Sequence, residues 1–175
     1  QAPRKKQSPG ARARSSAARR TAGAAPPRFI APQLARLVSH APADPGWGHE
    51  IKFDGYRMQM RVGGGKAALR TRTGLDWTPR FPEIAEAGSA LPDCVIDGEI
   101  VALDRHGVPS FSALQSALVD EDTADLVYFV FDLLFLDGKD WRKKPLKERR
   151  AKLASLMEEK GVSNFLVYAD SVDGA

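Results

Sequence analysis

Apolar and polar residues alternate along much of the chain beyond residue 55, a pattern typical of β-strands with one buried face. The alternation predicts strands over residues 56–62 and 66–72, joined by three glycines that permit a tight reversal. Further strands are predicted over residues 94–103, 126–136 and 165–169. We therefore expect largely antiparallel pairing.

Helical periodicity and end signals predict three helices between these strands. The expected ranges are residues 79–88 with Thr78 as N-cap and Pro79 as first helical residue, residues 111–119 with Ser110 as N-cap, and residues 145–160 with Gly161 after the last turn. Strands and helices together indicate the α+β class, with largely antiparallel sheets and flanking helices.

Charge is distributed unevenly along the chain. The net charge is +4, yet residues 1–28 hold eight Arg or Lys and no acid, which leaves 18 basic against 22 acidic residues in 29–175. The first 28 residues are rich in Ala, Arg, Pro and Ser and predict a disordered basic linker or arm. Such an arm would attract phosphate backbones, and a solvated tether without a binding role is the alternative.

Composition favours a cytoplasmic protein. The longest apolar stretch, residues 126–136, is interrupted by Asp132 and is shorter than the about 20 residues of a membrane span. The one cysteine, Cys94, cannot form an internal disulfide and is expected in the core. The scattered histidines predict no zinc site. The first residue is Gln rather than Met, which suggests a piece of a longer polypeptide.

The candidate chemistry is concentrated in residues 50–57, Glu-Ile-Lys-Phe-Asp-Gly-Tyr-Arg. As a short strand running into a tight turn, this segment has a polar face and an apolar face: Glu50, Lys52 and Asp54 on the first, Ile51 and Phe53 toward a core. An amine would then lie between two carboxylates in a pocket wall. The alternative is a β-hairpin with an Asp-Gly turn and an ordinary surface lysine.

The run Lys-x-Asp-Gly-x-Arg in residues 52–57 resembles the nucleotidyl-transfer motif of ATP-dependent DNA ligases, RNA ligases and mRNA-capping guanylyltransferases. Three segments follow in the family's order: residues 71–78, Thr-Arg-Thr-Gly-Leu-Asp-Trp-Thr; residues 97–101, Asp-Gly-Glu-Ile-Val; and residues 129–138, Phe-Val-Phe-Asp-Leu-Leu-Phe-Leu-Asp-Gly. The residues in these segments look most like those of the ligase domain of bacterial non-homologous end-joining ligases.

This resemblance implies the covalent nucleotidyltransferase fold, with residues 29–175 as the N-terminal part of an adenylation domain. The family pattern continues with a Glu-Gly segment, a pair of lysines and an oligonucleotide-binding domain, none of which precedes Ala175. We therefore expect the domain to be C-terminally incomplete and the isolated chain to be inactive or severely impaired.

By the same resemblance, Lys52 is the catalytic nucleophile. It would attack the α-phosphate of ATP, displace pyrophosphate and carry AMP, which would pass to a 5′-phosphate before the 3′-hydroxyl seals the nick. A lysine amine ordinarily titrates near pH 10.4, so it needs desolvation or nearby cations to react at neutral pH. Arg57 and a bound metal ion would supply such cations.

The resemblance also implies how five other residues bind the nucleotide. Glu99 would hold the ribose hydroxyl and contribute to a metal site, Phe131 would stack on adenine, and Glu50 would lie next to the adenine amino edge. Arg57 and Arg72 would meet ribose or phosphate oxygens, to which an arginine fork is well suited. As surface arginines, both would be unremarkable.

Two of these assignments have structural alternatives. Glu99 could be an exposed strand acid, although Asp97 shares its strand face and apolar residues flank both. Phe131 could be a core residue, because a period of two gives one face to Val127, Phe129, Phe131 and Leu133.

The implied cofactors are ATP and Mg²⁺ or Mn²⁺, and the implied substrate is nicked or broken duplex DNA in a nucleoid-associated bacterial protein. Ku, the DNA-end protein of bacterial end joining, is the implied partner. An RNA ligase or a capping-type nucleotidyltransferase is the nearest alternative, and substrate and nucleotide preference distinguish them. A non-catalytic nucleic-acid-binding module is the alternative from another class.

Overall fold

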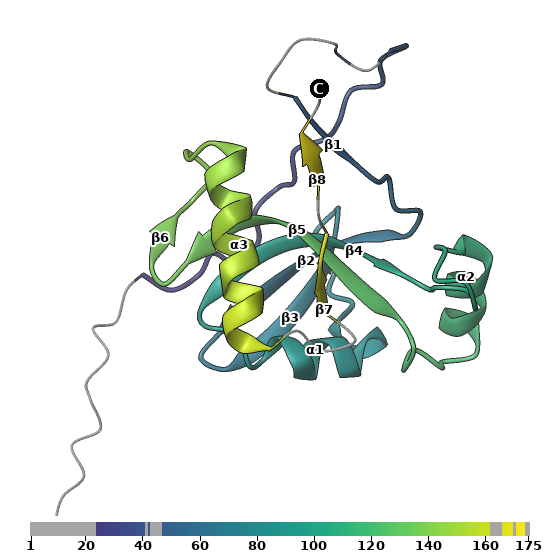
Figure 1. Cartoon of the computed structure of the whole chain (residues 1–175). Coiled ribbons are helices and arrows are strands. Elements are labelled where there is room, and N and C mark those ends of the chain that lie inside the picture. Colours follow the sequence, from purple (N-terminus) through teal and green to yellow (C-terminus); the bar gives the residue numbers. More distant parts are fainter. Residues whose placement is uncertain (1–23, 41, 43–46, 162–165, 170, 174–175) are drawn as a thin grey trace, which may run out of the picture.

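The computed structural model describes residues 24–40, 42, 47–161, 166–169 and 171–173. Its centre is a six-stranded sheet with the path β3-β2-β4-β5-β6 and with β7 on β5 (Figure 1). The strands are β2 (Tyr56–Gly63), β3 (Lys66–Thr71), β4 (Cys94–Val101), β5 (Val127–Leu136), β6 (Lys139–Asp140) and β7 (Leu166–Tyr168). All pairs are antiparallel except β5 with β7, so the predicted class is confirmed.

A second sheet projects from the edge of the first (Figure 1). It pairs β1 (Gly48–Glu50) with β8 (Ser171–Asp173), two strands that are far apart in the sequence. Residues 51–55 connect this sheet to β2, so the segment with the candidate nucleophile lies between the two sheets.

In the described part of the chain, three α-helices flank the main sheet: α1 (Pro82–Gly88), α2 (Phe111–Val119) and α3 (Leu146–Lys160). Helix α3 packs on β5 and α1 packs on β3 (Figure 1). The predicted ends of the last two helices are confirmed. Ser110 Oγ accepts from the N–H of Ala113 at 3.3 Å, and Gly161, with φ 66°, follows the last turn of α3.

The predicted start of the first helix is wrong. A short 3-10 helix, η1 (Thr78–Arg80), precedes α1, and Phe81 is the N-cap of α1. The Thr78 hydroxyl accepts from the N–H of Leu69 at 2.9 Å and donates to Asp76 at 2.6 Å. Because the hydroxyl is engaged with β3, it does not cap the helix, and Pro82 takes the first helical position.

The hydrophobic core lies between one face of the sheet and the helices. Its strand residues include Met58, Met60, Ile96, Ile100, Tyr128 and Val130, and its helical residues include Ile84, Leu114, Leu153 and Met157. Cys94 is fully buried there, as predicted. The Tyr128 hydroxyl donates to the Met58 carbonyl at 2.9 Å, so this buried polar group is satisfied.

The predicted common face of Val127, Phe129, Phe131 and Leu133 is wrong at Leu133, which belongs to the core. Asp97 of β4 pairs with Asp132, whereas its neighbour Gly98 pairs with Val130, so Phe131 is an extra residue in β5. This β-bulge shifts the alternation by one position. Phe131 and Asp132 consequently both line the same hollow.

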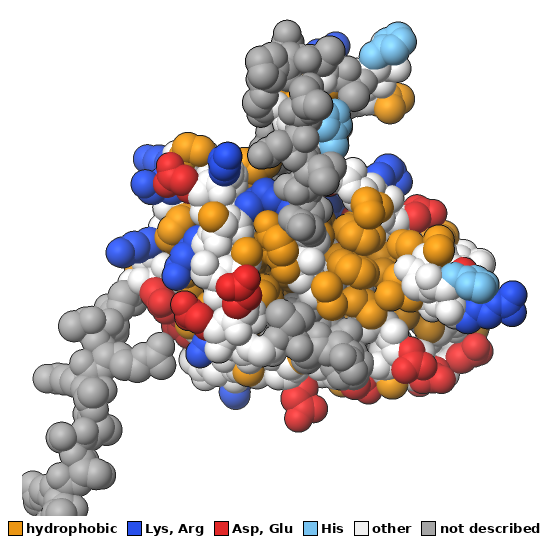
Figure 2. All heavy atoms as spheres, viewed as in Figure 1, with side chains coloured by type: hydrophobic (Ala, Val, Ile, Leu, Met, Phe, Trp, Pro, Cys, Tyr) orange, Lys and Arg blue, Asp and Glu red, His pale blue; other side chains and the backbone are white. Residues whose placement is uncertain are grey.

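Side chains of different kinds gather on different parts of the surface. Lys and Arg side chains lie around α3, and apolar side chains gather between α3 and α2 (Figure 2). At the N-terminal end of the described chain, Pro26 is buried and its carbonyl accepts from Arg61 Nε at 3.1 Å. Most of the predicted basic arm, residues 1–23, lies outside the described residues. None of the helices described is both long enough and apolar enough to cross a membrane.

Candidate functional site

The segment with Lys52 is neither a continuous strand nor a hairpin turn. Strand β1 ends at Glu50, residues 51–54 have no regular structure, and β2 begins at Tyr56. Ile51, expected toward a core, is 73% exposed. Phe53 is half-buried and stacks on Phe129, with ring centroids 4.4 Å apart. The predicted strand with an apolar inner face is therefore wrong. The course of the loop, rather than a strand alternation, determines which of its side chains are buried.

Gly55 explains why this loop runs close to β4. A Cβ at Gly55 would lie 2.2 Å from the Ile100 carbonyl oxygen, so no other residue fits without a backbone shift. The Gly55 N–H donates to Glu99 Oε1 at 3.0 Å. The Asp-Gly pair therefore fastens the lysine loop across β4 and does not form a β-hairpin.

One hollow of about 640 Å³ brings together five of the predicted site residues. Its lining includes Glu50, Lys52, Arg57, Glu99 and Phe131. The volume is in the range of small-molecule sites. The Lys52 side chain is exposed at this hollow, and Phe131 is half-buried in its wall. Residues from both sheets and from the connecting loop thus converge on one space.

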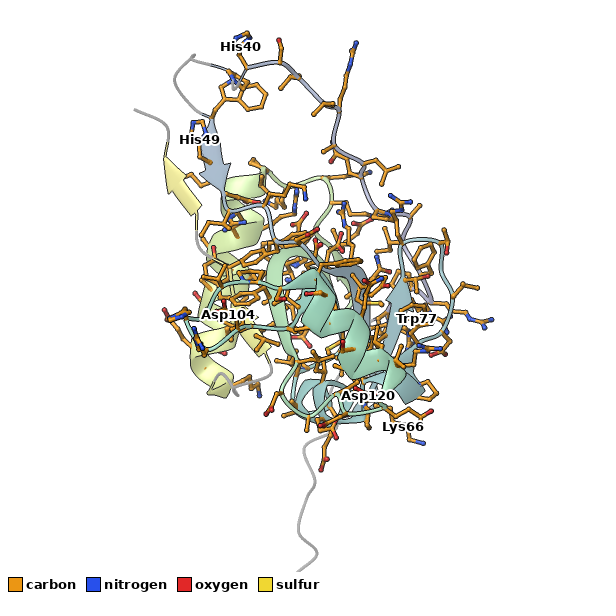
Figure 3. The ribbon with its side chains drawn as sticks, turned by 90° about the vertical axis from the view of Figure 1, so that its right-hand side faces the viewer. His40, His49, Lys66, Trp77, Asp104 and Asp120 are labelled. Carbon is orange, nitrogen blue, oxygen red and sulfur yellow. The ribbon has the colours of Figure 1, made fainter. Side chains whose placement is uncertain are left out.

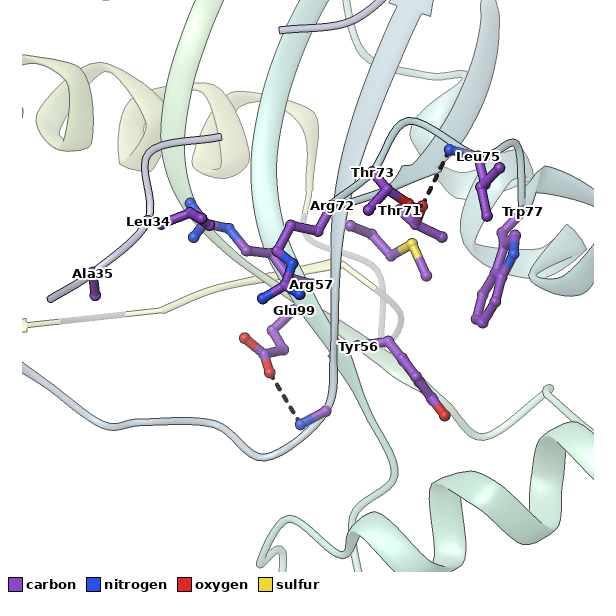
Figure 4. Close-up of a pocket in the computed structure, with 12 residues that line it drawn as sticks. Leu34, Ala35, Tyr56, Arg57, Thr71, Arg72, Thr73, Leu75, Trp77 and Glu99 are labelled. Atoms are coloured by element: carbon purple, nitrogen blue, oxygen red, sulfur yellow. Dashed lines mark hydrogen bonds between the residues drawn. The ribbon is translucent and has the colours of Figure 1, made fainter. Parts of the chain in front are cut away.

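Arg72 lines an adjoining hollow of about 680 Å³, which shares Arg57 and Glu99 with the first. Figure 4 shows the two arginines and Glu99 on one side and Leu75 and Trp77 on the other. Arg72 is exposed in the turn after β3. The six predicted residues therefore occupy two connected hollows.

Arg57 and Asp97 form the central ion pair of the site. Arg57 Nη2 and Nε lie 2.7 and 3.3 Å from the two Asp97 carboxylate oxygens, and Nη1 donates to the Gln33 carbonyl at 2.9 Å. Burial lowers the pKa of Arg57, but the hydrogen bond and charge of Asp97 outweigh it, so the pKa is raised. The guanidinium carbon also lies 5.5 Å from the Phe131 ring centroid.

Glu99 is half-buried on β4, opposite Arg57 of β2. Burial raises the pKa of Glu99, although the Gly55 N–H and the charges of Lys52 and Arg57 act in the opposite direction. The Gly55 N–H engages Oε1, and no hydrogen bond to Oε2 occurs among the described residues. One carboxylate oxygen of Glu99 thus holds the loop, and the side chain lines both hollows.

Two arginines of α3 complete the site and were missed from the sequence. Arg149 donates to both carboxylate oxygens of Asp132, at 2.7 and 3.0 Å. Arg150 is only 7% exposed and donates to Glu50 Oε1 at 2.5 Å and to the Phe131 carbonyl at 3.2 Å. The spacing of Arg150 to the buried Leu153 and Met157, three and seven residues on, would have placed it on the buried face of α3.

Within the described part of the chain, no group of three or more His, Cys, Asp or Glu side chains could hold a metal ion. Figure 3 shows His40 and His49 at one end of the molecule, well separated from Asp104 and Asp120. A preformed protein cage is therefore absent from the described residues. Of the three carboxylates that line the hollow, Glu50 and Asp132 are paired with arginines of α3, and Glu99 accepts from the Gly55 N–H.

Comparison with known proteins gives a consistent match. The sequence model of the family described as ATP dependent DNA ligase domain matches residues 32–173. The multifunctional non-homologous end joining protein LigD of Pseudomonas aeruginosa is 44% identical over 134 residues, which cover 75% of this chain and 16% of that protein. LigD of Mycolicibacterium smegmatis is 33% identical over 151 residues, which cover 85% of this chain and 19% of that protein.

Solved structures agree with this match. The ligase domain of M. tuberculosis LigD is 34% identical with a TM-score of 0.60, over 73% of this chain and 41% of that chain. A mycobacterial DNA ligase D complexed with ATP and MES is 32% identical with a TM-score of 0.63, over 79% of this chain and 46% of that chain. The present chain thus spans less than half of the ligase chains it resembles.

Proposed function

Because the chain belongs to the family of ATP dependent DNA ligase domains, we propose that it is the lysine-bearing part of a DNA ligase adenylation domain. The ligase would join 5′-phosphate and 3′-hydroxyl ends of nicked or broken duplex DNA through a lysyl-AMP intermediate. Relatives named for non-homologous end joining favour a role in double-strand break repair. The observation that carries this proposal is the single hollow lined by Lys52 and four other predicted site residues.

Lys52 is the proposed nucleophile. Its neutral amine would form a bond from Nζ to the α-phosphorus of ATP while the bond to the pyrophosphate oxygen breaks. Nζ would then carry a positive charge and lose one proton to give the neutral nitrogen of lysyl-AMP. Lys52 lies at the mouth of the hollow in a loop held by Gly55, so its amine can approach a phosphate bound there. Positioning of this kind is the main source of catalysis in phosphoryl transfer.

The hollow suggests an orientation for ATP. Phe131 offers an aromatic ring for base stacking. The Glu50 carboxylate, bonded to the same Arg150 nitrogen as the Phe131 carbonyl, offers a hydrogen-bond acceptor to the base. Arg57, Glu99 and Arg72 follow toward the adjoining hollow. The Glu99 carboxylate is suited to a ribose hydroxyl, and the two arginines are suited to ribose or phosphate oxygens. The mycobacterial relative solved with ATP supports this ligand.

A divalent metal ion would enter with the nucleotide. Mg²⁺ commonly uses one or two carboxylates together with substrate phosphates and waters, so it needs no protein cage. Glu99 fits this mode because only one of its oxygens is engaged among the described residues. When bound, Mg²⁺ or Mn²⁺ would neutralise charge on the phosphates.

The proposed setting is the bacterial cytoplasm, close to the nucleoid, with duplex DNA as substrate and Ku as a partner at broken ends. The eight cations of residues 1–28 would add affinity for DNA. Nicked RNA tested beside nicked DNA distinguishes this ligase from an RNA ligase, and labelling with GTP distinguishes it from a capping enzyme.

The decisive experiment is adenylation of the ligase that contains this chain. With ATP and Mg²⁺, the protein should gain the mass of one AMP, and a digest should place it on the peptide with Lys52. Lys52→Ala should abolish the gain, whereas Lys66→Ala, at an exposed lysine at the start of β3, should leave it unchanged. Undiminished labelling of Lys52→Ala would refute the assignment.

A further inference from the structure

We propose that Arg150 is a positioning residue that sets the base preference of the nucleotide site by holding Glu50 and the backbone of Phe131. The proposal rests on the proposed function, since it concerns the same hollow. It adds a residue of α3 to the residues that the motifs indicate.

Arg150 is a buried cation with three hydrogen-bond acceptors among the described residues. Its side chain is only 8% exposed, and a guanidinium withdrawn from water to this extent is costly unless it is paired. Nη1 donates to Glu50 Oε1 and to the Phe131 carbonyl, and Nη2 donates to the Ala169 carbonyl at 2.5 Å. The guanidinium carbon lies 5.3 Å from the Tyr168 ring centroid.

These acceptors belong to different parts of the fold. Glu50 ends β1 in the two-stranded sheet, Phe131 is the bulged residue of β5, and Ala169 follows β7. Arg150 therefore ties the Glu50 carboxylate to the backbone that carries the Phe131 side chain. A planar guanidinium suits this task because its N–H groups point in fixed directions, whereas a lysine amine offers no fork.

The fixed carboxylate has a consequence for which base is accepted. Arg150 engages Glu50 Oε1, and no hydrogen bond to Oε2 occurs among the described residues. A carboxylate oxygen attracts an amino group and repels an oxo group. A purine with a 6-amino group next to Glu50 is therefore favoured over one with a 6-oxo group, provided that the carboxylate cannot turn away.

Arg150 also limits repulsion inside the hollow. Glu50, Glu99 and Asp132 contribute three carboxylates to a space proposed to take a polyanion. Arg150 compensates Glu50, as Arg149 compensates Asp132. Loss of Arg150 would leave the Glu50 carboxylate free to reorient toward solvent, because its side chain is 42% exposed.

The test compares the binding of AMP and IMP to the 175-residue chain by calorimetry. AMP carries an amino group where IMP carries an oxo group, and neither has a pyrophosphate leaving group, so no reaction with Lys52 occurs. The unmodified chain should prefer AMP by about 10- to 100-fold, the range expected for a hydrogen bond to a charged group. Arg150→Met should reduce this preference to about threefold or less, and Arg150→Lys should give an intermediate value.

Two further variants distinguish an effect on the preference for AMP over IMP from an effect on the stability of the fold. Lys147→Gln removes an exposed cation from the same helix and should leave the AMP preference unchanged. Glu50→Gln should relax the preference with Arg150 in place, since an amide can present either a donor or an acceptor. Melting temperatures identify variants that do not fold. If Arg150→Met does not fold, Arg150→Lys, which keeps the charge, still tests the proposal.

The outcomes are distinguishable. An AMP preference that falls in Glu50→Gln and in the Arg150 variants supports the proposal. A preference that falls in Glu50→Gln but stays at its original value in folded Arg150 variants overturns the role of Arg150 alone. If the unmodified chain shows no AMP preference, or if the preference persists in Glu50→Gln, the proposal for Arg150 is overturned. The placement of the base next to Glu50 in the proposed function is then overturned as well.

Discussion

The two faces of β4 are built from alternate residues of one eight-residue strand, yet one face packs apolar side chains and the other carries charged side chains. Ile96 and Ile100 point into the core, where each contacts several apolar neighbours. Asp97 and Glu99 point to the site, where Asp97 pairs with Arg57 and Glu99 accepts from Gly55. Apolar contacts are non-directional and shared among many atoms, whereas the charged groups of the site face depend on a few defined hydrogen-bond partners.

This difference predicts which substitutions are tolerated. On the core face, another apolar residue of similar volume should be accepted at modest cost. On the site face, removal of one partner leaves the other charged group partly buried and unpaired, and such a loss is costly in proportion to its burial. Substitutions of adjacent residues in β4 should therefore differ in their effect on the free energy of unfolding.

The largest expected effect is on the core face. Ile96→Ala should lower the free energy of unfolding by about 2 to 5 kcal/mol, because the fully buried side chain leaves a cavity. Urea unfolding measures the loss, and the affinity of the folded fraction for AMP should be unchanged. Val119→Ala, at a residue that is 81% exposed, is the matched control and should change stability by less than about 0.5 kcal/mol.

A smaller effect is expected for Asp97→Asn on the site face. It should cost about 1 to 3 kcal/mol of unfolding free energy, reduced from the cost of a fully buried pair because the Arg57 side chain is 27% exposed. Arg57→Met combined with Asp97→Asn should cost less than the sum of the two single changes. Strict additivity in this double-mutant cycle would mean that the pair is not coupled.

Phe131→Leu should separate binding from stability. The half-buried ring should contribute about 1 kcal/mol to base stacking, roughly a fivefold rise in the Kd for AMP. Its stability cost should stay below about 1.5 kcal/mol, since leucine keeps much of the apolar contact. A large fall in melting temperature with unchanged AMP affinity would favour a core role for Phe131.

The smallest effect at neutral pH concerns Cys94, the first residue of β4. Burial raises the pKa of this thiol from an ordinary 9.0 to about 12, so the folded chain should not react with a disulfide reagent at pH 8. One thiol should become reactive in guanidinium. Since the unfolded thiol ionises first, stability should fall as the pH rises from about 9 to 12. Rapid reaction of the native chain would contradict the burial of Cys94.

Much of the fold was predictable because alternation and capping are local signals. They indicated β2, β4, β5 and helices α2 and α3 close to their observed bounds. The parallel pairing of β7 with β5 and the pairing of β1 with β8 join distant segments, and no local pattern specifies such a register. The bulge at Phe131 likewise depends on how β4 and β5 align, which is why Leu133 was assigned to the wrong face.

The site was predictable only in part. Short motifs indicated Lys52, Glu99 and Phe131, which do line one hollow, while their chemical roles stay predictions. Arg150 was missed because an arginine among the many cations of α3 is read as solvent-exposed. The exposed position of Ile51 was missed because a period of two was applied to a loop.

The hydrogen bond from Gly55 to Glu99 has a mechanical consequence for the loop before β2. Lys52 is three residues from the anchored N–H, and the anchor is a carboxylate of β4 that lines the same hollow as Lys52. A substitution that displaces the Glu99 carboxylate should therefore also shift the Lys52 loop, so the position of the amine is transmitted from the main sheet through a short stretch of backbone.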